Sequence, residues 1–130
     1  MLEDVRKGTV MELNAAQKNN IVVLAPRGRI DHLNADAFGK AVAPHVEACN
    51  KDGPRLLFDL SSLEYISSAG LRILMLASKR AIPAGGRIGV AAPTALVREI
   101  LEISRFDLVF PVFDTVNAGL ASFADPAAGH

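Results

Sequence analysis

The sequence contains no tryptophan, only one tyrosine and one cysteine, and its formal net charge is zero. Aromatic residues make up 5% of the 130 residues, whereas apolar residues make up 50%, so we expect a mainly aliphatic core. The shortage of aromatic side chains argues against the stacking surfaces of single-strand nucleic-acid binders. The 14 basic residues are balanced by 14 acidic ones, which leaves no excess to neutralise phosphates. Nucleic acid is therefore not an expected partner.

Disulfide chemistry and membrane insertion are also not expected. The single Cys49 excludes an internal disulfide and a cysteine-rich metal site, and we predict a small buried or half-buried residue on a helix. Residues 1–7 lack the apolar core of a signal peptide, and no apolar run approaches the roughly 20 residues of a membrane span. These absences predict a cytoplasmic protein that does not bind membranes.

Motifs of conventional enzyme chemistry are missing as well. The three histidines, His32, His45 and His130, show no metal-ligand spacing, and no HExxH, CxxC, GxSxG, Walker A or GxGxxG motif occurs. We therefore predict no catalytic residue, no metal and no cofactor. His45 falls on the apolar face of a predicted helix, whereas His32 follows Asp31 in a loop and is a candidate for the neighbourhood of a binding site.

The sequence does contain strand patterns that alternate with helix patterns, in a chain long enough to bury a sizeable core. The expected strands are 10–13, 21–25 with a continuation at 29–31, 55–60, 87–92 and 108–113, the last an edge strand because of Pro111. The expected helices are 35–46, 71–82, 95–103 and one ending near 123, with caps at Asn34, at Thr94 and at Asp114 or Thr115. Polar residues 14–20 are expected to form a hairpin turn, and residues 125–130 a frayed tail.

This order of elements predicts the fold class. Strands that alternate with helices pair mostly in parallel through right-handed crossovers, and the opening hairpin makes the sheet mixed. We expect an α/β fold with a mixed, mostly parallel sheet opened by an N-terminal β-hairpin, and about four helices packed mainly on one face. A single domain should span residues 1–130, with its core at about 10–123 and flexible termini.

The most informative stretch, residues 65–72, reads Tyr-Ile-Ser-Ser-Ala-Gly-Leu-Arg and joins a buried strand pattern to an apolar helix. A helix N-terminus favours added negative charge. Ser67 or Ser68 could simply cap the helix, which contributes about 1 kcal/mol. The small residues Ala69 and Gly70 leave room for a partner. Arg72 lies in the first turn, where a cation is unfavourable to the helix dipole. Its side chain therefore either faces an anion or an acidic partner, or is a solvated surface charge.

The run Phe58 to Arg72 resembles the signature of the STAS domain, specifically that of bacterial anti-sigma factor antagonists. Gly28 to Asp31 followed by Ala35 to Phe38 is similar to the family's loop into its first helix. Residues 101–106, with Phe110, Phe113 and Thr115, resemble its C-terminal part. The resemblance covers roughly residues 10–123 and implies the STAS fold.

The resemblance also implies a mechanism, in which the unmodified domain binds an anti-sigma factor that is also a serine kinase and so releases the sigma factor. Phosphorylation then switches binding off, and a serine phosphatase is a further implied partner. The phosphate acceptor is the serine two residues before the motif glycine, here Ser68. Ser67 is its rival and stands where relatives usually carry aspartate, while Ala69 stands where a serine often follows. The implied partner-binding residues are Asp31, His32, Ser67, Ser68, Ala69, Gly70 and Arg72. A monomer is expected.

Two alternatives remain at this point. The missing aspartate before Ser68 suits a STAS scaffold or adaptor that is not phosphorylated and belongs to a larger signalling assembly. A two-component receiver domain would use Asp59, at a strand end, as its phosphate acceptor. A receiver domain also needs an acidic pair after its first parallel strand and a lysine after a late strand. This chain has Pro26-Arg27-Gly28 and Ala91-Ala92-Pro93 at those places and so supplies neither.

Overall fold

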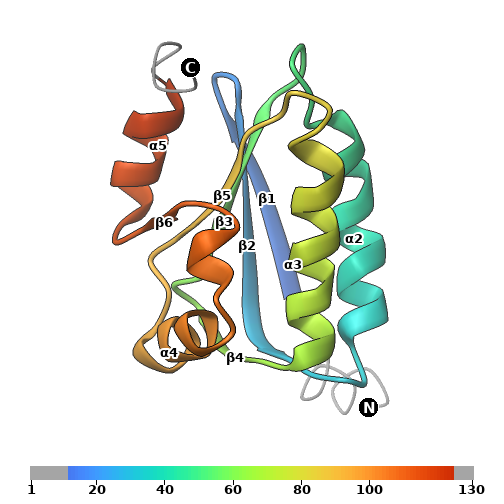
Figure 1. Ribbon diagram of the computed structural model, residues 1–130, viewed down its shortest axis with the longest axis vertical. Coiled ribbons are helices and arrows are strands. Elements are labelled where there is room, and N and C mark those ends of the chain that lie inside the picture. Colours follow the sequence, from blue (N-terminus) through green and yellow to red (C-terminus); the bar gives the residue numbers. More distant parts are fainter. Residues whose placement is uncertain (1–11, 125–130) are drawn as a thin grey trace.

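A six-stranded mixed sheet organises the computed structural model, which describes residues 12–124 (Figure 1). The elements are β1 Glu12–Lys18, β2 Ile21–Ile30, α2 Ala35–Ala48, β3 Arg55–Asp59, β4 Leu63–Ile66, α3 Ser68–Ala81, β5 Ile88–Ala91, α4 Ala95–Ile103, the 3-10 turn η1 Phe106–Leu108, β6 Val112–Phe113 and α5 Val116–Ala124. The strand order is β1-β2-β3-β5-β6, with β4 beside β2. Among the strands of residues 12–124, only the β1–β2 pair is antiparallel, which confirms the predicted fold class.

The opening hairpin is longer than expected. Strand β1 pairs with β2 from Glu12 opposite Arg27 to Lys18 opposite Ile21. The turn is therefore only Asn19 and Asn20, and the prediction of a turn over 14–20 was wrong. These polar residues lie in an exposed edge strand that lacks the usual apolar alternation, so pairing with β2 decides their conformation. Residues 10 and 11 of the predicted first strand lie outside the described residues.

Strand β2 changes its neighbour halfway along its length. Its first half pairs with β3 and its second half, as far as Ile30, pairs with β4. The register shifts between Gly28 and Arg29, and Gly28 has a φ of 91°, which suits glycine. The predicted continuation past Pro26 is thereby confirmed. The four-residue strand β4 was not predicted from the sequence.

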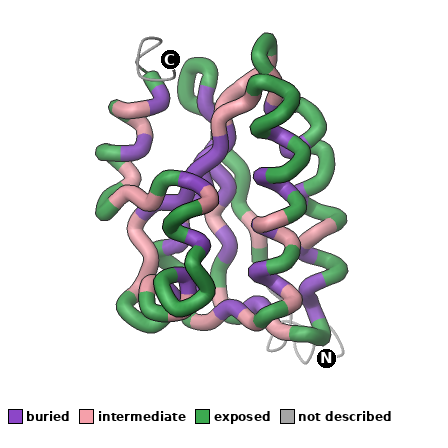
Figure 2. Tube along the Cα trace, viewed as in Figure 1, coloured by how far each residue is buried: buried purple, intermediate pink, exposed green. Residues whose placement is uncertain are grey.

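Many residues along the strands are buried (Figure 2), and their side chains pack into one cluster on each face of the sheet. Leu56 and Phe58 of β3 pack with residues from α2, α3 and α4, whereas Leu57 packs on the other face with Phe123 of α5. Three helices thus cover one face and α5 covers the opposite one. The core is mostly aliphatic, as expected, although five phenylalanines are also buried in it: Phe38, Phe58, Phe106, Phe110 and Phe123.

The C-terminal part differs from the expected strand over 108–113. Only Val112 and Phe113 form strand β6, which pairs with β5 alone and is therefore an edge strand, as expected. The predicted caps at Thr94 and Thr115 are confirmed, because their hydroxyl oxygens accept hydrogen bonds from Val97 N (3.3 Å) and Ala118 N (3.0 Å). The predicted tail at 125–130 lies outside the described residues.

Cys49 is 1% exposed, which confirms that it is buried, but it is the C-cap residue that follows α2 and does not lie on the helix as predicted. Its Sγ donates a hydrogen bond to Arg87 O at 3.2 Å. Within residues 12–124, no helix is long and apolar enough to cross a membrane.

Candidate functional site

The candidate site lies where the parallel strands β2 and β4 both end. Ile30 stands opposite Ile66 in the register, and the backbone N–H of Ser67 donates to Ile30 O at 2.8 Å. The Arg29 guanidinium lies 4.6 Å from the centre of the Tyr65 ring, which adds a cation–π contact between the two strand ends. The serine segment and the loop that begins at Asp31 are therefore neighbours, although they are far apart in the sequence.

Ser67 is the N-cap of α3. Its backbone is extended (φ −84°, ψ 173°), and its Oγ accepts a hydrogen bond from Gly70 N at 3.2 Å. Its carbonyl oxygen accepts from Leu71 N at 2.9 Å, the first bond of the helix ladder. The Ser67 hydroxyl thus satisfies one of the N–H groups that a helix start leaves unpaired.

Ser68 has a different environment, although it is the adjacent residue. It is the first residue of α3 and is exposed, and its hydroxyl makes no hydrogen bond to any residue of the described part of the chain. From the sequence, either Ser67 or Ser68 could cap α3. In the structure the Ser67 hydroxyl is hydrogen-bonded, whereas the Ser68 hydroxyl is accessible from solvent.

A hydrogen-bonded loop stands beside the serines. The Asp31 carboxylate Oδ1 accepts from Leu33 N (2.9 Å) and Asn34 N (3.2 Å). Asn34 Oδ1 accepts from Asp31 N (2.8 Å), and its Nδ2 donates to Arg29 O (2.8 Å). Asn34 holds the predicted N-cap position of α2, although its side chain makes no capping hydrogen bond. Its side chain, 5% exposed in total, instead fixes the shape of the loop.

This loop presents a residue that the sequence reasoning missed. Leu33 is 75% exposed, and the neighbouring His32 is exposed too. The sequence does contain a signal that could have identified Leu33, because it is a leucine in a polar turn between a strand and a helix. Because the loop is held by hydrogen bonds, the leucine is displayed on a defined backbone.

Gly70 and Ala69 contribute to the packing beneath the site. A Cβ at Gly70 would lie 2.6 Å from Ile30 Cγ2 and 2.7 Å from Ile66 Cγ1, so glycine lets α3 approach the strand ends closely. Ala69 is half-buried against the core. The predicted role of both residues in binding a partner stays a prediction.

Arg72 is exposed and forms no ion pair with any other residue between 12 and 124. It follows Ser68 by four positions, so both side chains lie on the same face of α3, one turn apart. A cation is thus available next to the exposed hydroxyl.

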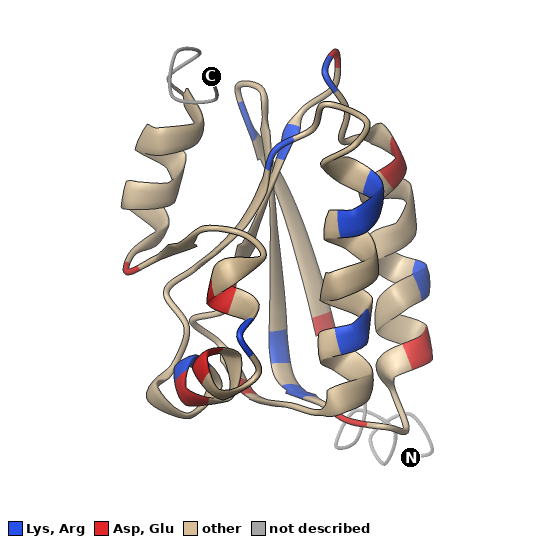
Figure 3. Ribbon diagram, viewed as in Figure 1, with Lys and Arg blue, Asp and Glu red and all other residues tan. Residues whose placement is uncertain are grey.

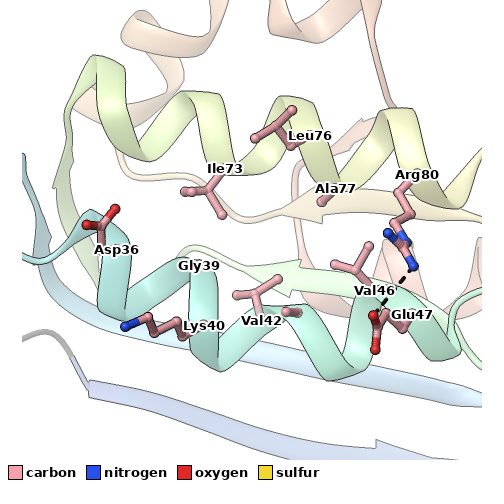
Figure 4. Close-up of a pocket in the computed structure, with 11 residues that line it drawn as sticks. Asp36, Gly39, Lys40, Val42, Val46, Glu47, Ile73, Leu76, Ala77 and Arg80 are labelled. Carbon is pink, nitrogen blue, oxygen red and sulfur yellow. Dashed lines mark hydrogen bonds and ion pairs between the residues drawn. The ribbon is translucent and has the colours of Figure 1, made fainter.

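A hollow of about 400 Å³ lies elsewhere, between α2 and α3 (Figure 4). Val42, Ile73 and Leu76 are among the apolar residues that line it, and the ion pair of Glu47 and Arg80 (3.4 Å) closes one end. No group of three or more histidine, cysteine, aspartate or glutamate side chains within the described residues could hold a metal ion. Asp59, the acceptor of the receiver-domain alternative, ends β3 and accepts from Ser61 N at 3.0 Å.

The chain is similar in sequence to a known domain family and to characterised members of it. A family model of the STAS domain matches residues 12–119. The anti-sigma-F factor antagonist RsfB of Mycobacterium tuberculosis is 31% identical over 109 residues, which are 83% of this chain and 85% of RsfB.

Solved structures share the fold. An anti-sigma factor antagonist from Mycobacterium paratuberculosis has a TM-score of 0.79 at 26% identity, covering 88% of this chain and 95% of that chain. Bacillus SpoIIAA has a TM-score of 0.67 at 14% identity in its unphosphorylated form and 0.63 at 12% in its phosphorylated form. The match covers 84% and 85% of this chain, and 93% and 97% of SpoIIAA, respectively.

Proposed function

This chain belongs to the STAS domain family of anti-sigma factor antagonists, and we propose that it is a phosphorylation-controlled partner switch. In its unmodified form it binds an anti-sigma factor that is also a serine kinase, and the sigma factor is released. Phosphorylation of Ser68 ends the complex, and a serine phosphatase restores it. The kinase and its ATP belong to the partner, so the role of this chain is regulatory rather than enzymatic.

The different environments of the Ser67 and Ser68 hydroxyls are the main support for this proposal. A kinase must reach the hydroxyl that it modifies, and Ser68 is exposed with its hydroxyl free. The Ser67 hydroxyl is half-buried and bonded to Gly70 N, so modifying it would break the cap. SpoIIAA, which has the same fold, is known in a phosphorylated form. These observations support Ser68 as the acceptor and Ser67 as its structural neighbour.

The surface around Ser68 has the features of a protein-binding site. Leu33 offers an exposed apolar anchor on a loop that hydrogen bonds already order, so little conformational entropy is lost on docking. Asp31, His32 and Arg72 surround the anchor and the serine with polar groups, as at the rim of an interface. We assign partner binding to this strand-end surface.

The same geometry explains how one phosphate could switch binding without refolding the domain. A phosphoserine carries a charge of about −1.5 to −2 at neutral pH. In the free domain this charge would stand at the N-terminus of α3, which the helix dipole favours, one turn before Arg72. In the complex it would lie in a desolvated contact beside the Asp31 loop, where an unpaired charge is costly.

The acceptor is tested by mass spectrometry after incubation of the purified chain with ATP and the anti-sigma factors of its source bacterium. We expect one phosphate on the wild-type protein and on Ser61→Ala, a matched control at an exposed serine in the turn before β4. Ser68→Ala should remain unmodified. If Ser68→Ala is labelled to the same extent as the wild type, the assignment is wrong.

Binding is tested with the anti-sigma factor that performs the modification. Calorimetric titration should show binding to the unmodified chain and a loss of at least about 30-fold in affinity for the phosphorylated chain, equivalent to roughly 2 kcal/mol for a buried unpaired group. Equal affinity of both forms would contradict the switch.

A STAS scaffold or adaptor is the second candidate, favoured by Ser67 in the position where relatives usually carry aspartate. It predicts no phosphate on Ser68 with any of these kinases, and unchanged partner binding by Ser68→Asp. The proposal also includes a monomeric chain and a cytoplasmic location, which analytical ultracentrifugation and cell fractionation can check.

A further inference from the structure

The hollow between α2 and α3 is an open groove with an apolar floor. The buried side chains of Val42, Val46 and Ala77 form this floor, and they are 1%, 7% and 4% exposed. Leu76 lines the α3 side and is 50% exposed (Figure 4). Six of the eleven residues that line the groove are exposed. A continuous apolar strip therefore faces solvent between two helices, which is typical of an interaction site.

The shape of the groove suits a helix. Its α2 side is low, because Gly39 and Ala43, one turn apart, have small or no side chains. A Cβ at Gly39 would lie only 3.0 Å from Ile73 Cδ1 of α3. The lining residues of α2 run from Asp36 to Glu47, a length of about 16 Å or about three helical turns. A groove of this length with one low side can hold a helix of similar length.

The two sides of the groove differ in charge. The charged residues of α3, namely Arg72, Lys79 and Arg80, are all basic, whereas α2 carries both acidic and basic residues (Figure 3). Arg80 pairs with Glu47 across one end of the groove at 3.4 Å. Lys79 is exposed and forms no ion pair within residues 12–124. It follows Leu76 by three positions, so a positive charge and an exposed apolar side chain are neighbours on the surface of α3.

We propose that this α2–α3 groove binds an amphipathic helix of a partner protein that carries acidic side chains along the edge facing α3. The apolar face of the partner helix lies on Val42, Ile73 and Leu76. Its carboxylates lie next to Lys79 and Arg80, which gives the contact its orientation and specificity. None of the residues assigned above to anti-sigma factor binding lines the groove, so this second site does not depend on the proposed switch.

Other occupants fit the groove less well. A small ligand is usually buried over most of its surface, and a groove with mostly exposed lining residues does not provide this. A two-fold dimer would set the same hollow surface against itself and leave both hollows unfilled. An added strand is excluded because both sides of the groove are helices, which offer side chains rather than a free row of backbone groups.

The probe is a synthetic helical peptide with leucines at positions i, i+3, i+4 and i+7 and glutamates along one edge. Nitrogen–proton spectra of the full chain, recorded during titration with this peptide, should show shifts at Gly39, Ala43 and Leu76 and none on α4. A peptide with glutamines in place of the glutamates should bind about twofold to fivefold more weakly for each charge pair lost. The proposal is overturned if the groove signals do not shift, or if a lysine-edged peptide binds as tightly as the glutamate-edged one.

Variants of the chain separate the groove from non-specific apolar binding. Leu76→Asp should weaken binding of the glutamate-edged peptide by at least about tenfold, because it removes the apolar wall and adds a like charge. Ile103→Asp, at a 74% exposed residue of α4 outside the groove, should bind as the wild type does. Lys79→Gln, at an exposed position, should bind the glutamine-edged peptide normally and lose part of the preference for glutamate.

The remaining outcomes count against the proposal. Equal affinity of Leu76→Asp and the wild type for the glutamate-edged peptide would overturn it. Self-association of the wild type in sedimentation, abolished by Leu76→Asp, would assign the groove to a second copy of the chain instead. Shifts of the groove signals with decanoate but not with the peptide would assign it to a small apolar ligand.

Discussion

Replacing Ser67 with alanine removes the one side-chain hydrogen bond that caps α3. Loss of an N-cap costs about 0.5–2 kcal/mol, and the 3.2 Å distance from Ser67 Oγ to Gly70 N is at the long end for a hydrogen bond. We therefore expect a loss of about 1 kcal/mol in the free energy of unfolding, or about 4 °C in melting temperature. Ser68→Ala is the matched control. The Ser68 hydroxyl is exposed and unbonded, so its removal should change stability by less than about 0.5 kcal/mol.

Urea unfolding followed by circular dichroism measures both variants, and the phosphorylation assay is then run on the same samples. Ser67→Ala should lose stability and keep its phosphate, whereas Ser68→Ala should keep its stability and lose its phosphate. Ser67→Asp should keep the cap and with it the stability of the wild type, because a carboxylate at that position accepts the same N–H. Equal stabilities for Ser67→Ala and Ser68→Ala would refute the assignment of the cap.

Two further predictions concern packing and pH. Gly70→Ala should lower the free energy of unfolding in urea by about 1–3 kcal/mol, because its Cβ would lie 2.6 Å from Ile30 Cγ2. Gly39→Ala should lower it less, because the nearest atom to its Cβ would be the flexible Cδ1 of Ile73 at 3.0 Å. The reverse order of the two variants would contradict this packing. Burial raises the pKa of the Cys49 thiol, so the unfolded chain loses this proton at a lower pH than the folded one does. The free energy of unfolding should therefore fall as the pH rises past about 8.5, and Cys49→Ala should lack this part of the slope in unfolding curves at pH 7.5 and 9.5.

Elements with a strong apolar pattern were predictable from the sequence, and weakly patterned ones were not. Residues 55–59 and 88–91 form buried strands because each contains a continuous run of non-polar residues, Leu56 to Phe58 and Ile88 to Ala91. Residues 14–18 are polar residues and alanines that are exposed on both faces, so only pairing with β2 makes them a strand. Residues 108–111 are predicted to be part of a strand because they are apolar, but Leu108 ends η1 and residues 109–111 connect it to the short β6.

The candidate site was also predictable only in part. The residue types of the serine segment and its place at a strand-to-helix passage follow from the sequence, because capping and helix periodicity are local properties. Which serine caps α3 depends on where the helix begins, and that follows from the bond of Ser67 N to Ile30 O at the end of β2.

The sequence by itself thus determined the alternation of strands and helices, the aliphatic core and the motif around Ser68. Only the tertiary structure decided that the Asp31 loop stands beside that motif and that Leu33 is displayed there. The physical reason is that strand pairing joins residues that are distant along the chain. Periodicity shows which face of a strand is buried, but not which strand lies next to it.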